Sequence, residues 1–161
     1  MGVLVLSNEP GQREVLTMST ENQKLVTRYF EEMCTGRKLE VADEIIAADH
    51  VHHDPSSPWV GQGPEAMKQL ASIYQNGFPD ARWTVNALYE VGDTVIARWT
   101  GTGTHRNDLN GIAPTGKSVN VEAIMIFRIA NGRIAESWDV WDTLGMLQQL
   151  GVVPALARAA A

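Results

Sequence analysis

Residues 118–142 constrain the fold of this sequence more than any other stretch, because they are typical of a long β-hairpin. The segments Ser118–Ala130 and Arg133–Asp142 are both rich in residues that favour strands, and Asn131-Gly132 separates them. Asn-Gly between two such segments predicts a type I′ turn, since that turn requires positive φ at both of its central residues. The two segments are therefore predicted to form adjacent antiparallel strands.

The second strand of this hairpin carries two acidic and two indole side chains near its end. Because side chains alternate across a strand, residues two apart share a face. One face is predicted to carry Ser137, Asp139 and Trp141, and the opposite face Trp138, Val140 and Asp142. Asp139 is then a carboxylate beside large apolar neighbours, which makes it a candidate catalytic residue. Asp142 precedes a predicted helix, where an acid stabilises the N-terminus, so we expect a structural role for it.

The rest of the sequence predicts helices first and strands afterwards. Thr20 and Gln23 belong to a capping box for a first helix, and Gly36 is expected to end that helix in the C′ position. Pro64 is well placed as the first residue of a later helix. The predicted elements are helices at 20–36, 41–49, 64–77 and 143–150, a short strand at 50–54, and strands at 82–91, 94–105, 118–130 and 133–142.

This order of elements indicates an α+β fold, in which helices pack on one face of a curved antiparallel sheet. A sheet covered on one face only leaves a cone-shaped cavity, which the N-terminal helices are expected to close. Pockets of this kind hold small molecules. We assign residues 19–151 to one domain, 1–18 to an N-terminal extension and 152–161 to a C-terminal tail.

Composition excludes several classes of function. The chain has 161 residues and a net charge of −6, and its basic residues are scattered, which argues against nucleic acid as a partner. No apolar run approaches the length that spans a membrane, so no membrane partner is expected. Cys34 is the single cysteine, which excludes an intrachain disulfide and favours a reducing compartment. These features predict a cytoplasmic protein.

A cluster of histidines precedes Pro55. His50 and His52 are expected to point to one side of a short strand and His53 to the other, and Asp54 follows them. A metal site is one interpretation, and packing at a strand end is the other. No further carboxylate–histidine motif completes a coordination sphere, so no metal is predicted.

Several short motifs occur together along the chain. They are Phe78-Pro79-Asp80, Gly92-Asp93, Gly101–His105, Gly111–Gly116, Phe127-Arg128-Ile129, Asn131–Ile134, Trp138–Asp142 and Gln148–Gly151. With these motifs, the sequence from Asn22 to Gly151 resembles the SnoaL-like polyketide cyclases, a family of ester cyclases in the NTF2-like superfamily. The resemblance implies an NTF2-like α+β cone with a small-molecule ligand in its pocket.

The resemblance also implies a catalytic residue and a reaction. The family's catalytic aspartate falls on Asp139, where it serves as the general acid and base of an intramolecular aldol closure. Such a proton transfer needs a carboxyl group in a dry cavity, and no cofactor is expected. Burial beside Trp141 would raise the pKa of Asp139 from about 3.9 toward the operating range.

One position departs from the family. The classical cyclases have a histidine on the preceding strand, where this sequence has Met125, and methionine cannot relay a proton. His105 or His53 could replace that histidine. His53 precedes Asp54-Pro55, and in this family a histidine before Asp-Pro commonly faces the cavity. His105 could equally end its strand without touching a ligand. The predicted substrate-binding residues are His53, His105, Trp141, Met125 and Trp83.

Three functions remain open from the sequence. The first is a cofactor-independent enzyme acting on a small carbonyl compound, and the second is a non-catalytic small-molecule-binding or dimerisation domain. The third is a hydrolase that activates water with Asp139. The face that carries Glu122, Trp138 and Val140 lies opposite the pocket, and its apolar residues predict a homodimer through the outer sheet face.

Overall fold

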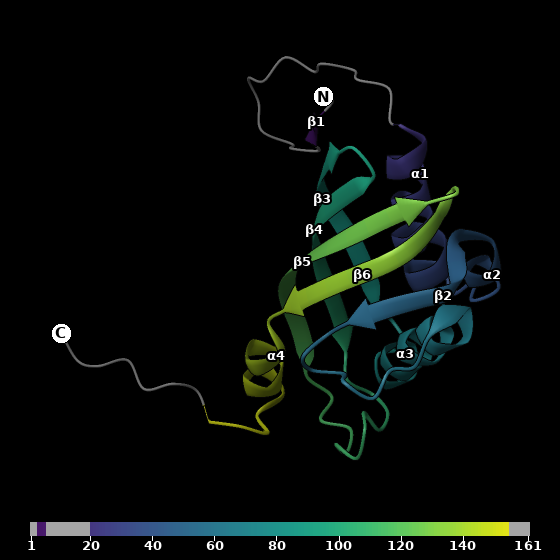
Figure 1. Cartoon of the computed structure of the whole chain (residues 1–161). Coiled ribbons are helices and arrows are strands. Elements are labelled where there is room, and N and C mark those ends of the chain that lie inside the picture. Colours follow the sequence, from purple (N-terminus) through teal and green to yellow (C-terminus); the bar gives the residue numbers. More distant parts are fainter. Residues whose placement is uncertain (1–2, 6–19, 155–161) are drawn as a thin grey trace.

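The structure is a computed structural model that describes residues 3–5 and 20–154 of the chain (Figure 1). The six strands are β1 Val3–Val5, β2 Ile46–His53, β3 Arg82–Val91, β4 Thr94–Thr104, β5 Ser118–Ala130 and β6 Arg133–Trp141. The helices are α1 Glu21–Arg28, the π-helix η1 Tyr29–Thr35, α2 Val41–Ile45, α3 Gly63–Gly77 and α4 Thr143–Leu150. Within the described ranges no helix is long and apolar enough to cross a membrane.

The predicted hairpin is confirmed. Asn131 and Gly132 both have positive φ, at 51° and 70°, and strands β5 and β6 pair antiparallel on either side of them. Strand β6 ends at Trp141, one residue before its predicted end, because Asp142 caps helix α4 by accepting the Gly145 N–H at 2.8 Å. In this register Met125 lies directly opposite Asp139.

The first helix begins as predicted and ends differently. The Thr20 hydroxyl accepts the Gln23 N–H at 3.1 Å, as the capping box predicted. Gly36, however, has a φ of −75°, and the left-handed residue is Arg37 with a φ of 59°. The Arg37 guanidinium holds this conformation by donating to the carbonyls of Gln75 and Pro79. Glycine is needed at position 36 for space, since a Cβ there would lie 2.7 Å from the Glu32 carbonyl oxygen.

Two predictions near residue 46 are wrong. Helix α2 ends at Ile45 instead of Asp49, and β2 begins four residues before the predicted strand. The apolar stripe of Val41, Ala42, Ile45 and Ile46 also fits a short helix followed by a strand, and all four residues are buried. Strand β2 pairs parallel with β6, so the sheet is mixed and not wholly antiparallel.

The α+β cone is confirmed. The sheet order is β1-β3-β4-β5-β6-β2, and Figure 1 shows the sheet curving around the helices on one side. Alternate residues of β4 and β5 are buried on the concave face, among them Ala97, Met125 and Phe127. Phe30 of η1 packs edge-on against Phe127 at 5.8 Å between ring centroids. Of the predicted extension and tail, only 3–5 and 152–154 fall among the described residues.

Candidate active site

An apolar cavity of about 90 Å³ lies between the helices and the concave face of the sheet. Its aromatic and aliphatic walls include Phe30, Trp83, Trp99, Val121, Met125 and Trp141. Its polar lining consists of Cys34, Asp54, Tyr74, Arg82, Thr102 and Asp139, together with the Tyr29 hydroxyl. The lining residues come from η1, α3, α4, four strands and the segments that connect them, so the pocket depends on the whole fold.

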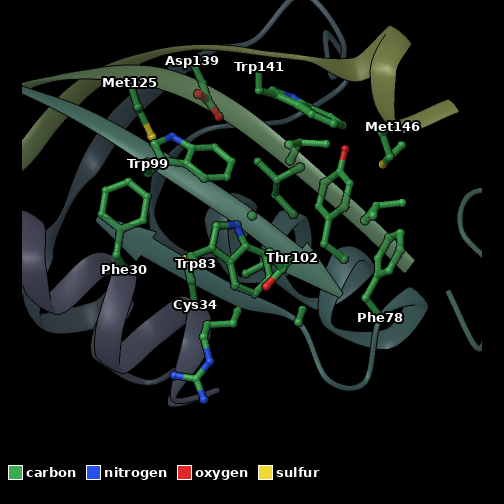
Figure 2. A pocket seen from close by; sticks show the side chains of 18 of the residues that line it. Phe30, Cys34, Phe78, Trp83, Trp99, Thr102, Met125, Asp139, Trp141 and Met146 are labelled. Atoms are coloured by element: carbon green, nitrogen blue, oxygen red, sulfur yellow. The ribbon is translucent and has the colours of Figure 1, made fainter. Parts of the chain in front are cut away.

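Asp139 points into this pocket from β6, beside Trp99 and Trp141 (Figure 2). Burial and the nearby carboxylate of Asp54 raise the pKa of Asp139 from 3.8 to about 8, although the Trp99 indole and the Val140 backbone N–H oppose the shift. The Asp139 side chain is partly accessible because it faces the cavity, while protein atoms surround it on its other sides. Its Oδ1 and the Trp99 Nε1 have no hydrogen-bond partner in the described part of the chain.

Three of the predicted pocket residues lie with Asp139. Trp83, Met125 and Trp141 all line the cavity, and Figure 2 shows Met125 and Trp141 on either side of Asp139, with Trp83 further from the carboxyl group. Trp141 is held in place by its indole N–H, which donates to the Ser56 hydroxyl at 3.1 Å. Its ring meets the Tyr74 ring edge-on at 5.7 Å between centroids.

His53 does not reach the pocket. Strand β2 runs parallel to β6 with His53 opposite Trp138, so the His53 side chain shares the outer face with Trp138. There its Nε2 lies 2.9 Å from Glu136, its ring stacks on Trp138, and 44% of the side chain is exposed. The prediction of His53 as a substrate-binding residue is corrected on this ground.

His105 lies behind the pocket wall and does not line the cavity. Strand β4 ends at Thr104, and the backbone N–H of His105 donates to the Lys117 carbonyl, which turns the residue under the following loop. The ring is fully buried against Phe78, with its Nδ1 near the Thr115 hydroxyl at 3.2 Å. Neither His105 nor His53 therefore takes the place of the histidine that Met125 replaces.

Asp54 is a pocket residue that the sequence analysis did not assign to the pocket. It directly follows β2, its side chain is buried, and it lines the cavity. The missing information was the pairing of β2 with β6, which no local sequence pattern revealed.

Tyr74 also lines the cavity, and burial raises its pKa to about 12. Burial likewise raises the pKa of the Cys34 thiol well above its usual range, which keeps the thiol protonated and unreactive.

The inward histidines of β2 form a small buried cluster with a serine of β6. The His50 Nε2 and the His52 Nδ1 each lie 2.9 Å from the Ser137 hydroxyl. Burial and the neighbouring His52 lower the pKa of His50 to about 4, so this pair is neutral at physiological pH. Among residues 3–5 and 20–154, no group of three or more His, Cys, Asp or Glu side chains is arranged to hold a metal.

Comparisons with known proteins found a matching family model, related sequences and similar solved structures. The family model described as "SnoaL-like polyketide cyclase" matches residues 24–150. The aklanonic acid methyl ester cyclase DnrD of Streptomyces peucetius is 31% identical over 83% of this chain and 92% of its own length. The nogalonic acid methyl ester cyclase of Streptomyces nogalater is 32% identical over 73% of this chain and 87% of its own. The structure of TsrD from Streptomyces laurentii matches with a TM-score of 0.75 and 27% identity, covering 83% of this chain and 96% of that one.

Proposed function

Because the chain belongs to the SnoaL-like polyketide cyclase family and has its NTF2-like cone, we propose that it closes a ring in a polyketide ester by acid–base catalysis through Asp139. The observation that carries the proposal is a carboxyl group with a pKa near 8 that faces an apolar pocket. A carboxylate of raised pKa is a stronger base than an ordinary one, and an operating pH close to the pKa is the best condition for proton transfer.

The reaction proposed is an intramolecular aldol addition. The Asp139 carboxylate removes a proton from a carbon flanked by carbonyl groups, and the resulting enolate carbon attacks a ketone carbon of the same molecule. The protonated Asp139 then returns the proton to the new alkoxide oxygen. Substrate and product are isomers, so the chemistry needs a base that becomes an acid and no cofactor.

The substrate class follows from the relatives and from the size of the cavity. The two relatives are named as cyclases of aklanonic acid methyl ester and nogalonic acid methyl ester, and we infer that a polyketide methyl ester is the substrate class here. The cavity of about 90 Å³ is smaller than the roughly 300–1,000 Å³ of pockets that enclose a whole drug-sized ligand. The reacting end of the substrate is therefore proposed to enter the pocket, while the rest lies at its mouth near Arg82.

The test is direct. Incubation of the protein with a polyketide methyl ester, without added cofactor, is expected to give a product of the same mass and a different chromatographic retention. A hydrolysed ester would instead support the alternative in which Asp139 activates water. Saturable binding of the ester without any new product would favour the second alternative, a small-molecule-binding domain of the same fold. That alternative is supported by Met125, which leaves Asp139 without a histidine on the neighbouring strand.

We also propose that the protein is a homodimer joined through the outer face of the sheet. Ile124 and Val140 lie opposite each other on β5 and β6 and are 53% and 68% exposed. Trp138 is 37% exposed beside them, and Glu122 lies on the same face. Adjacent exposed apolar side chains of this kind mark protein contacts, and a second copy offers the same patch to itself.

Replacing Val140 with lysine is expected to shift the protein from dimer to monomer. In a symmetric dimer the introduced lysine would face the same lysine of the second copy, and the two charges would repel. Loss of a central interface residue lowers the binding free energy by about 2 kcal/mol or more, which is about thirty-fold in the dissociation constant. Light scattering over a concentration series measures this change. Val91→Lys is the matched control, because Val91 is 70% exposed at the far end of β3. A wild-type protein that stays monomeric at high micromolar concentration would remove the proposal.

A further inference from the structure

Two carboxyl groups lie at one level of the pocket, Asp54 directly after the end of β2 and Asp139 on the neighbouring strand β6. Strand β2 runs parallel to β6 with His52 opposite Ser137 and His53 opposite Trp138. The same register, carried one residue further, brings Asp54 beside Asp139. Both residues line the cavity, and Asp54 is only 8% exposed. Two acids at one level of a largely apolar pocket repel each other when both are charged.

The Asp54 carboxyl group accepts several hydrogen bonds. Its Oδ1 accepts the Ser56 backbone N–H at 2.7 Å and the Ser56 hydroxyl at 2.6 Å. Its Oδ2 accepts the Trp141 indole N–H at 3.4 Å, which is a longer and weaker contact. Hydrogen bonds donated to a carboxylate stabilise the negative charge. The donors near Asp139 are fewer: the Trp99 indole and the Val140 backbone N–H favour its charged form, and its Oδ1 is buried without a well-formed hydrogen bond among the described residues.

We propose that Asp54 is a positioning residue of this site: its charge makes Asp139 the stronger base of the pair, and its oxygens fix Trp141 as a wall of the pocket. This inference rests on the proposed function, in which Asp139 transfers the proton. It gives the pocket a second functional carboxyl group. The residue opposite Asp139 on β5 is Met125, which cannot transfer a proton.

The other ionisable groups around Asp139 do not supply this effect. Tyr29 and Cys34 of η1 and Tyr74 of α3 face the same cavity, and burial raises the pKa of each, so they remain neutral near pH 8. Arg82 of β3 lines the cavity as well, but its side chain is exposed to solvent. Asp54 is therefore the charged group that acts on Asp139 from within the pocket, and its charge adds to burial in raising the Asp139 pKa.

The proposal is tested by titrating Asp139 itself, in the protein without substrate. Carbon-13 NMR of the labelled aspartate carboxyl groups follows the Asp139 signal, assigned by its absence in Asp139→Asn. The Asp54→Asn variant keeps acceptor oxygen and shape while removing the charge. We expect it to lower the titration midpoint by about one pH unit or more, the scale of a close charge pair. The low-pH limb of kcat/KM for ring closure should move in the same direction.

Two controls separate charge from packing. Ser56→Ala removes the hydroxyl that holds both Asp54 and Trp141 but leaves the Asp54 charge, so it should raise KM without moving the midpoint. Asp49→Asn makes the same change of net charge at an exposed position of β2. It should change neither KM nor the titration midpoint of Asp139. Should Asp54→Asn fail to fold, Asp54→Ser also removes the charge while retaining a hydroxyl acceptor, and the same shift is expected.

The outcomes are distinguishable. An Asp139 midpoint that stays within about 0.3 pH units in Asp54→Asn or Asp54→Ser overturns the inference, because a close like charge shifts the midpoint by more. A midpoint that moves together with the activity profile supports it. A midpoint that moves while the activity profile does not would keep the carboxyl pair but overturn its catalytic role, and with it the proposed function of Asp139.

Discussion

Replacing Asp139 with asparagine is expected to lower kcat/KM for ring closure about a hundred-fold or more while substrate affinity stays within a few-fold. Asparagine keeps the size and polarity of the side chain but cannot exchange a proton, and loss of a positioned acid or base has this scale. Product formation by chromatography gives the rate, and equilibrium titration with the substrate gives the affinity.

Asp142→Asn is the matched control for this variant. Asp142 lies three residues further along the chain and caps helix α4 without lining the pocket. Because asparagine is as good an N-cap as aspartate, this control should fold and turn over as the wild type does. Equal activity of Asp139→Asn and wild type would mean that the reaction does not use the Asp139 carboxyl group.

The pH dependence of kcat/KM is expected to show a rising limb with its midpoint near pH 8. A base acts in its ionised form, and the pKa of Asp139 is raised to about 8 by burial and by Asp54. A group with that pKa is about 1% ionised at pH 6 and half ionised at pH 8, so the rate constant should rise about fifty-fold over this interval. A midpoint near 4, the value of an ordinary carboxyl group, would contradict the account.

The same shift predicts the sign of a stability change. The folded pKa of Asp139 lies above its value of 3.8 in the unfolded chain, so the folded state binds this proton more tightly. The stabilisation from this proton is complete below the unfolded pKa and is lost as the pH rises through the folded pKa near 8, above which both states are ionised. Denaturant titrations should therefore show that wild type loses more stability between pH 5 and pH 9 than Asp139→Asn does.

The strands that form the pocket wall could be predicted because their signals are local. Alternating side chains set the faces of β5 and β6, and this alternation was sufficient to put Asp139 and Trp141 together and Trp138 on the outside. Met125 of β5 and Trp83 of β3 belong to equally regular strands, and both line the cavity. The turn at Asn131-Gly132 fixed the register in which Met125 meets Asp139.

The residues contributed by β2 could not be predicted in the same way. Which way their side chains point depends on the parallel pairing of β2 with β6, two strands separated by more than eighty residues. Nothing in the local sequence encodes that pairing. That pairing turns His53 outward and Asp54 inward, so one was assigned to the pocket wrongly and the other was missed. His105 illustrates a related limit, because a strand that ends one residue early directs the side chain under a loop.

Hydrogen exchange at the reacting carbon tests the central claim most directly, since it observes the proton transfer without requiring ring closure. The probe is a β-keto methyl ester that lacks the acceptor carbonyl, dissolved in deuterated buffer and followed by proton NMR. With wild-type protein, deuterium is expected to enter the carbon between the carbonyl groups faster than in buffer alone, and with Asp139→Asn the rate should fall to that of buffer. Exchange that is equally fast with both proteins, or no faster than buffer with wild type, would contradict the assignment of Asp139 as the base.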